Sequence, residues 1–249
     1  MEIRTAKAMQ DQLVCGRLRF FNREIPVLVR YSKLSPAEEQ ARFEQARHKA
    51  VLQLAACYDR TAQDLSADTA AIFAIHAMLL EDEDLEEHIY QMIWEEKTTA
   101  EYAVMTTGKL FANIFSAMND SYMKARSVDI RDLSRRVIFL LLGRQSEDPL
   151  HHEDSILVAD EFLPSEVIEL DRRHLLGLIS CHGSINSHAA MLLRAYHIPF
   201  MAEVELEAGW DGHMALMDGV GSRIYLDPDP EQEAQLRRQY EEENMLIHH

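Results

Sequence analysis

The chain has 249 residues, of which 47% are hydrophobic and 27% are charged, a balance typical of a soluble globular protein with enough material for one large core or two smaller ones. Its formal net charge of −17 excludes nucleic acid as a partner, because phosphates require a basic surface, and favours a basic protein partner. Acidity that only keeps the protein soluble is the alternative. The longest uncharged apolar run, 137–142, is too short to span a membrane, and the start has no apolar segment of signal-peptide type, so we expect neither membrane insertion nor export.

Three cysteines, Cys15, Cys57 and Cys181, are widely spaced and form no Cys-x-x-Cys pair. They therefore predict neither a disulfide framework nor a structural zinc site, and a cytoplasmic location fits best. Cys181, His182 and His188 match no common zinc spacing, so we predict no metal ligand.

The first 33 residues contain two apolar pieces, 13–15 and 25–29, separated by a polar segment at 20–24. They predict two strands and a turn. From Ser35 the pattern becomes helical: Ser35 is an N-cap, Pro36 occupies the first turn, and Glu38 closes a capping box.

The helical pattern continues to residue 144 in several segments. The first helix should reach about residue 65, and further helices should cover 69–80, 89–95 and the two stretches beyond a Thr98–Glu101 capping box. Gly143 is the expected C-terminal cap of the last helix. Apolar stripes at three- and four-residue steps therefore predict an antiparallel helical bundle over 34–144.

A polar connector at 145–152 leads to short apolar runs that alternate with short helical ones. This alternation predicts an α/β domain with a partly parallel sheet. The expected strands are 156–158, 175–179, 200–204, 213–217 and 224–226, the expected helices are 165–170 and 189–196, and a charged surface helix follows at 231–246.

The stretch 178–199 carries the candidate chemistry, because it reads as a strand, a polar turn and a helix that stops before Pro199. Ser187 is a good N-cap residue and places His188 among the N–H groups of the first helical turn, which favour an anion. A neutral imidazole can attack phosphorus near pH 7, and a phosphate carried on His188 would be held there. A histidine that only caps or packs the helix is the alternative.

This region resembles the phosphohistidine domain of enzyme I of the bacterial sugar phosphotransferase system, which pyruvate phosphate dikinase and phosphoenolpyruvate synthase share. The family pattern is Gly-Gly-(Arg or Met)-Thr-Ser-His, then a helix with Ala-Arg and an apolar-Pro pair; the matching residues are Ser187, His188, Arg194, Ile198 and Pro199. The resemblance implies that His188 carries phosphate.

Three neighbours are expected to support His188. Ser187 caps the helix, Asn186 stands in for the family's threonine as a hydrogen-bonding group, and Arg194 either neutralises phosphate or balances the end of its own helix. The chain departs from the family at Ile185, where a cation is usual, and at Val167, where the family has a threonine close to the active histidine.

Two bundle segments select enzyme I over its relatives. Residues 72–83 resemble Ile-Phe-Glu-Gly-His-Ile-Met-Leu-Leu-Glu-Asp-Glu, and residues 122–133 resemble Tyr-Leu-Lys-Glu-Arg-Ala-Ala-Asp-Val-Arg-Asp-Ile. In that family the bundle is an insertion that docks the phosphocarrier HPr. An apolar centre ringed by acids suits such a partner, whereas a solvated helix face is the alternative. The expected docking residues are His76, Leu79, Asp82, Glu83, Asp84, Leu85, Tyr122 and Arg126.

The expected fold is mixed, of the α+β / α/β class: a swivelling phosphohistidine α/β domain with an inserted antiparallel helical bundle. Its expected boundaries are 1–33 and 145–230 for the discontinuous α/β domain, 34–144 for the HPr-binding bundle, and 231–249 for a linker helix.

The resemblance implies a phosphoryl-transfer domain of the phosphoenolpyruvate-protein phosphotransferase type, which carries phosphate on His188 and exchanges it with HPr or an HPr-like domain. We expect no cofactor in this chain, since phosphoenolpyruvate and magnesium belong to a carboxy-terminal domain outside the sequence. That domain is a second partner if the chain is a fragment; a fragment should be monomeric and bind neither nucleic acid nor membrane.

Two alternatives stay open. One is that the chain is a stand-alone relative of the truncated enzyme I-like domain of the dihydroxyacetone kinase phosphotransfer subunit. Ile185 and Val167 favour a degenerate, non-catalytic HPr-binding or regulatory module.

Overall fold

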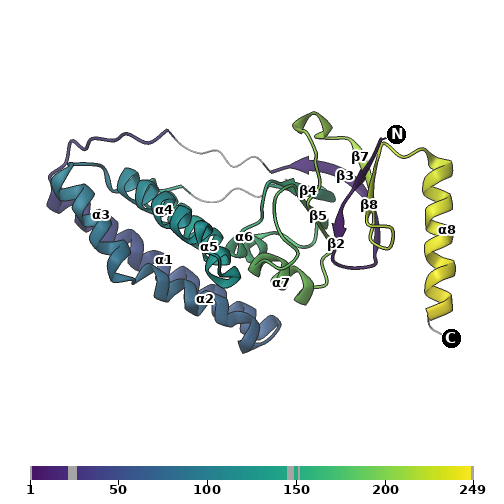
Figure 1. Ribbon diagram of the computed structural model, residues 1–249, viewed down its shortest axis with the longest axis horizontal. Coiled ribbons are helices and arrows are strands. Elements are labelled where there is room, and N and C mark those ends of the chain that lie inside the picture. Colours follow the sequence, from purple (N-terminus) through teal and green to yellow (C-terminus); the bar gives the residue numbers. More distant parts are fainter. Residues whose placement is uncertain (1, 22–26, 145–148, 151, 248–249) are drawn as a thin grey trace. The chain divides into compact units, whose positions relative to one another are not determined.

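The computed structural model describes residues 2–21, 27–144, 149–150 and 152–247 (Figure 1). The chain divides into two compact units. Unit 1 contains residues 1–23, 148–162 and 169–249, and unit 2 contains residues 24–147 and 163–168. No helix among the described residues combines the length and the apolar character that a membrane crossing needs.

A mixed sheet forms the centre of unit 1. Within the described residues its strand order is β1-β8-β7-β3-β4-β5-β6-β2. The neighbours β3 (Leu13–Phe20), β4 (Ser155–Ala159), β5 (Leu175–Ser180) and β6 (Phe200–Ala202) are parallel. Antiparallel strands complete both sides: β7 (Met214–Asp218), β8 (Arg223–Leu226) and β1 (Glu2–Thr5) beyond β3, and β2 (Lys7–Ala8) beyond β6.

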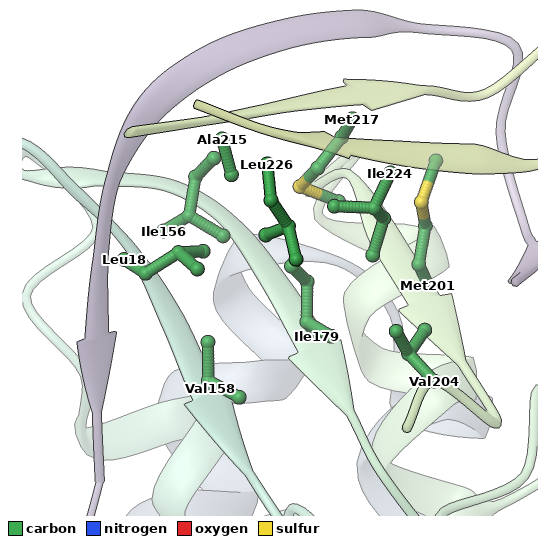
Figure 2. Packing of buried hydrophobic residues seen from close by; sticks show 10 residues of the cluster. All are labelled: Leu18, Ile156, Val158, Ile179, Met201, Val204, Ala215, Met217, Ile224 and Leu226. Atoms are coloured by element: carbon green, nitrogen blue, oxygen red, sulfur yellow. The ribbon is translucent and has the colours of Figure 1, made fainter. Parts of the chain in front are cut away.

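A cluster of buried apolar side chains of unit 1 lies on one face of this sheet. Figure 2 shows side chains from neighbouring strands converging, among them the alternate residues Ile156 and Val158 of β4 and Ile224 and Leu226 of β8. Alternate positions share a face because successive side chains in a strand point to opposite sides. All five residues of β4 are buried, as expected for a central parallel strand that is covered on both faces.

Short helical segments lie between strands of unit 1: the helix α7 (His188–Ala195) follows β5, and a 3-10 turn (Ala208–Trp210) precedes β7. The 18-residue helix α8 (Pro230–Ile247) follows the last strand, β8. The predicted partly parallel sheet is therefore confirmed. Two strands, β1 and β2, were missed by the sequence pattern. Parts of the predicted turn at 20–24, the predicted strand at 25–29 and the predicted connector at 145–152 lie outside the described residues. The described part of that strand, residues 27–29, does not form a strand.

Unit 2 is a helical bundle, as predicted. Its long helices are α1 (Pro36–Asp64), α2 (Ala67–Leu80), α3 (Glu83–Glu95), α4 (Ala100–Ala117) and α5 (Ser121–Leu141). Figure 1 shows these helices running alongside one another. Their apolar stripes meet in a core that includes Phe43, Phe73, Leu54, Ile89, Ile93 and Ile130, all almost fully buried.

The helix ends agree with the predicted capping residues at some positions and differ at others. The Ser35–Glu38 capping box is present, and Gly143 takes the left-handed φ of +63° after α5. The Thr98–Glu101 box is wrong by one residue, because Thr99 is the N-cap of α4 and its hydroxyl accepts the N–H of Tyr102. The third helix starts at Glu83, six residues before the predicted start, because the side chain of Asp82 caps it.

The unit boundaries differ from the predicted ones at two places. The described residues 27–33 belong to the bundle: the Thr99 N–H donates to the carbonyl of Arg30 at 2.9 Å, and the Ser32 N–H donates to the carbonyl of Lys97 at 3.1 Å. Residues 163–168 also belong to the bundle, and all of them except Leu163 lie in the helix α6 (Pro164–Glu169). The Ser165 N–H donates to Asp132 at 3.1 Å, and Glu166 pairs with Arg135 at 2.7 Å.

Candidate functional site

The start of α7 is built around Ser187. Its φ of −71° and ψ of 161° are those of an N-cap residue, and its hydroxyl accepts the N–H of Ala190 at 3.1 Å. His188 is the first residue of the helix. The predicted cap is therefore confirmed, and it places the imidazole beside the positive end of the helix dipole.

His188 is partly exposed, whereas the next two residues, Ala189 and Ala190, are buried. The helix is thus anchored by its apolar side while its first side chain can be reached from solvent. An anion held at such a helix end would be stabilised by backbone N–H groups and the dipole together.

The turn before α7 is tied to the ends of two strands. The Ser180 hydroxyl donates to the carbonyl of Asp160 at 2.9 Å and accepts the N–H of Gly183 at 2.7 Å. A Cβ atom on Gly183 would collide with the Ser180 hydroxyl oxygen, so this position requires glycine. The His182 N–H continues the pairing of the strands by donating to Asp160 at 2.7 Å.

These contacts assemble the site at the carboxyl ends of β4 and β5, the edge at which parallel sheets usually present ligand-binding groups. Asp160 follows β4, and His182 and His188 follow β5. The His182 ring lies 3.4 Å from the Asp160 carboxylate, and both side chains are 82% exposed. The sequence interpretation overlooked this pair, although Asp160 lies two residues and His182 three residues beyond the end of a predicted strand.

The supporting residues differ in position. Arg194 lies in the last turn of α7, and six helical residues correspond to about 9 Å along the helix axis from His188. This geometry favours a role at the negative end of the helix dipole over direct contact with a phosphate on His188. Asn186 is exposed just before the helix, and Ile185 is partly exposed. Val167 is fully buried in α6, within unit 2.

Among the residues that the structure describes, the ligand atoms of Cys181, His182 and His188 do not come together as a group that could hold a metal ion. Burial also raises the pKa of the Cys181 thiol, which disfavours the thiolate form that metals bind. None of the three cysteines takes part in a disulfide.

The residues predicted for partner docking split into two groups in unit 2. Asp82, Glu83 and Asp84 are exposed at the start of α3, and Tyr122 is 51% exposed on α5, where its hydroxyl accepts a hydrogen bond from Arg126 at 2.9 Å. The apolar members of the prediction need correction, because Leu79 and Leu85 are buried in the bundle. An exposed apolar side chain that the prediction omitted is Met78 of α2, 71% exposed.

His76 also needs correction. Its side chain is completely buried, and its Nε2 lies 3.2 Å from Oδ1 of Asp129, which is itself buried on α5. An enclosed imidazole cannot form part of an exposed docking face. His76 therefore holds α2 against α5.

Fold and site together define a class of protein: an α/β domain that presents a histidine at the start of a helix and is interrupted by a helical bundle. The family model described as PEP-utilising enzyme, N-terminal, matches residues 5–126, and the model described as PEP-utilising enzyme, mobile domain, matches residues 151–220. The chain belongs to this family of PEP-utilising enzymes, and it is recognised as an amino-terminal domain of enzyme I.

Two similar sequences support the same family assignment. The chain is 35% identical over 214 residues to the phosphoenolpyruvate-protein phosphotransferase of Bacillus sp. (strain S), and equally to that of Geobacillus stearothermophilus. Each alignment covers 82% of this chain but only 36% of the relative, so the chain spans about a third of their length.

Two solved structures have the same fold. An NMR solution structure of enzyme I matches with a TM-score of 0.71 at 24% identity, covering 97% of this chain and 99% of the other. A structure of the N-terminal domain of Enzyme 1 - Nitrogen matches with a TM-score of 0.61 at 28% identity, covering 96% and 99%. The expected architecture, an α/β domain with an inserted bundle, is thereby confirmed.

Proposed function

We propose that this chain is a phosphoryl-transfer module of the enzyme I type, in which His188 carries phosphate and exchanges it with a histidine of HPr. The observation that carries the proposal is the position of His188: partly exposed, first in a capped helix, at the carboxyl ends of parallel strands. Phosphoryl transfer depends mainly on positioning and on stabilisation of charge, both of which a helix start supplies.

The proposed phosphoryl transfer involves only this chain and phosphorylated HPr. A neutral ring nitrogen of His188 attacks the phosphorus of phosphorylated HPr, a new N–P bond forms, and the N–P bond to the HPr imidazole breaks. The electron pair of that bond stays on the departing imidazole, which leaves as a neutral group because its other ring nitrogen carries a proton, and the N–H proton on the second ring nitrogen of His188 stays in place. Because the bond that forms and the bond that breaks are both N–P bonds to an imidazole, the reaction runs in both directions.

HPr would dock on unit 2. The exposed acids Asp82, Glu83 and Asp84 would attract a basic partner, while Met78 and Tyr122 would supply apolar contact. Arg126 would hold the Tyr122 hydroxyl in place, and the buried His76, Leu79 and Leu85 would support this face from beneath.

The donor of phosphate to this chain is then phosphorylated HPr or a carboxy-terminal domain. We propose that phosphoenolpyruvate and magnesium are used only by that carboxy-terminal domain and that His188 needs no cofactor to exchange phosphate. A cytoplasmic location is part of the proposal, and the absence of a disulfide among the three cysteines is consistent with it.

The second candidate function is a binding module that no longer transfers phosphate. Val167 lacks a hydroxyl and is fully buried, and Ile185 lacks the cation that would neutralise phosphate. Both features would slow transfer, and neither would weaken docking on unit 2.

Incubation with phosphorylated HPr separates the two functions. Transfer predicts an acid-labile, alkali-stable phosphate on this chain that disappears in His188→Ala and persists in His182→Ala, which removes an exposed imidazole from the same turn. Binding of HPr without any phosphate on the chain would reject the transfer function and leave the module.

Salt dependence tests the docking face. Affinity for HPr should fall as ionic strength rises, because the acids at the start of α3 are exposed and their attraction is screened. Glu83→Gln/Asp84→Asn should reduce that dependence, whereas Glu203→Gln, an exposed acid of unit 1, should not. An affinity that salt does not change would argue against an acidic docking face.

A further inference from the structure

Two histidines and an aspartate meet at the opposite edge of the sheet from His188, at the amino ends of β4 and β5. His152, Asp171 and His174 each bring one ligand atom within 4.8 Å of the other two. His152 lies in the turn before β4, and Asp171 and His174 lie in the turn before β5. The two strands are parallel and begin paired at Ser155 and Leu175, so their preceding turns come together.

A fourth side chain orients this group. The Asp154 carboxylate lies 2.8 Å from Nδ1 of His174. A carboxylate can only accept, so Nδ1 carries the proton and Nε2 keeps the lone pair that can bind a cation. Histidines that ligate metals almost always donate their other N–H to a carboxylate, carbonyl or water in this way.

The backbone fixes the same arrangement. The Ser155 N–H donates to the carbonyl of His174 at 3.0 Å, and the His174 N–H donates to that of Asp171 at 3.3 Å. The His152 and His174 rings meet edge to face, with centroids 6.0 Å apart. The position of the three groups is therefore set by strand pairing and by a tight turn.

One residue competes for Asp171. The Arg173 guanidinium donates to both carboxylate oxygens, at 2.9 Å and 2.6 Å, while its side chain is 80% exposed. A metal ion would have to share the Asp171 carboxylate with Arg173 or displace the guanidinium. Because Arg173 is exposed, displacing it costs little free energy.

We propose that His152, Asp171 and His174 form a binding site for a divalent first-row transition ion, of which Zn²⁺ fits best, with Asp154 as the orienting carboxylate. Two imidazoles and one carboxylate are a common set for zinc with an open position for water, whereas Mg²⁺ and Ca²⁺ prefer oxygen ligands alone. Ligand atoms around tetrahedral zinc lie about 3.4 Å apart, so groups whose ligand atoms lie within 4.8 Å of one another must move closer together to bind the ion. The exposed ring of His152 can supply this movement.

The site joins the turn before β4 to the turn before β5, which are separated in sequence. Because it lies at the edge of the sheet away from His188, the ion stabilises unit 1 and takes no part in phosphoryl transfer. This inference revises the sequence-based expectation that the chain contains no metal ligand.

Titration calorimetry with zinc chloride tests the site on the full chain with His248→Ala and His249→Ala, which remove the terminal imidazoles. One zinc ion should bind per chain, and magnesium chloride should give no binding at the same concentration. His152→Ala and His174→Ala should each weaken zinc binding by at least about 50-fold, and Asp171→Asn and Asp154→Asn by about tenfold. His213→Ala is the matched control, because His213 also pairs with an aspartate at 2.8 Å but belongs to no three-residue group within the described chain.

A variant that should strengthen zinc binding distinguishes loss of a ligand from general damage to the turn. Arg173→Ala frees the Asp171 carboxylate and should tighten zinc binding by about threefold or more. Zinc should raise the melting temperature of the parent chain by about 3–5 °C and leave that of His174→Ala unchanged. Zinc binding that survives both histidine substitutions, or that Arg173→Ala weakens, overturns the proposal, as does equally tight magnesium binding.

Discussion

The two compact units use histidine in opposite ways. In unit 2, His76 is enclosed between helices and contacts a buried aspartate. In unit 1, His188 begins a short helix and remains partly exposed. The middle of α2 is covered by its neighbours, so a histidine there becomes structural, whereas the first residue of α7 adjoins a turn. A match to a family motif therefore has to be combined with access before an imidazole is assigned a role in exchange with another molecule.

The largest stability effect should come from His76. His76→Ala leaves a cavity and removes a partner from the buried Asp129, and it should lower the free energy of unfolding of the bundle by about 3 kcal/mol. Urea unfolding followed by circular dichroism measures this loss. His188→Ala and His48→Ala, at partly exposed and exposed positions, should each cost less than about 0.5 kcal/mol. If His76→Ala were as mild as these, the contrast between the two histidines would not hold.

The turn that carries His188 gives the next largest effect. Gly183→Ala forces a Cβ atom against the Ser180 hydroxyl, which is engaged with two backbone groups, and should cost about 1–2 kcal/mol. Phosphate exchange with HPr should slow as the turn shifts. Gly209→Ala is the control, because that Cβ meets open space. Equal effects of the two variants would mean that the turn is not tightly built.

The cap of α7 has a smaller effect. Ser187→Ala removes the acceptor of the Ala190 N–H and should cost about 1 kcal/mol. The equilibrium of phosphate between the two proteins should also move severalfold toward HPr, because a frayed helix start holds an anion less well. Ser35→Ala, which removes the cap of α1 in unit 2, should cost a similar free energy without changing that equilibrium. If Ser35→Ala also moved the phosphate equilibrium toward HPr, that equilibrium would report only the stability of the chain.

The smallest effect concerns pH. Burial raises the pKa of Asp132, which accepts hydrogen bonds from the N–H and the hydroxyl of Ser165. The folded state then binds this proton more tightly than the unfolded state does. Its contribution to stability is complete below the ordinary pKa of 3.8 and is lost as pH rises through the raised value. The unfolding free energy of the parent should fall relative to Asp132→Asn as pH rises from about 4 toward neutrality, as urea unfolding at several pH values can measure. A difference that is independent of pH contradicts the raised value.

Local signals in the sequence were enough for much of the fold. Ser35, Pro36 and Glu38 predict the start of α1, and Ser187 predicts the start of α7, because capping depends on residues within one turn. Helical and alternating apolar periods likewise predict the bundle and the central strands. The parallel pairing of β4 with β5 and of β5 with β6 follows from the alternation of strands and helices.

Other features depend on partners that are distant in sequence. The strand β1 is short and half polar, and it forms because β8, more than 200 residues later, pairs with it. The segment that forms α2 is apolar on almost all sides, so its sequence pattern does not show that His76 and Leu79 face the other helices. His152 and His174 come together only through the register of β4 and β5, which no short motif records.

The most direct test follows the phosphate. After incubation with phosphorylated HPr and removal of the donor, peptide mapping by mass spectrometry under alkaline conditions locates the phosphoryl group. We predict a single phosphate on His188 that returns to HPr when unphosphorylated HPr is added. A chain that binds HPr but gains no phosphate, or that gains it on a residue other than His188, would contradict the assignment of His188 as the carrier.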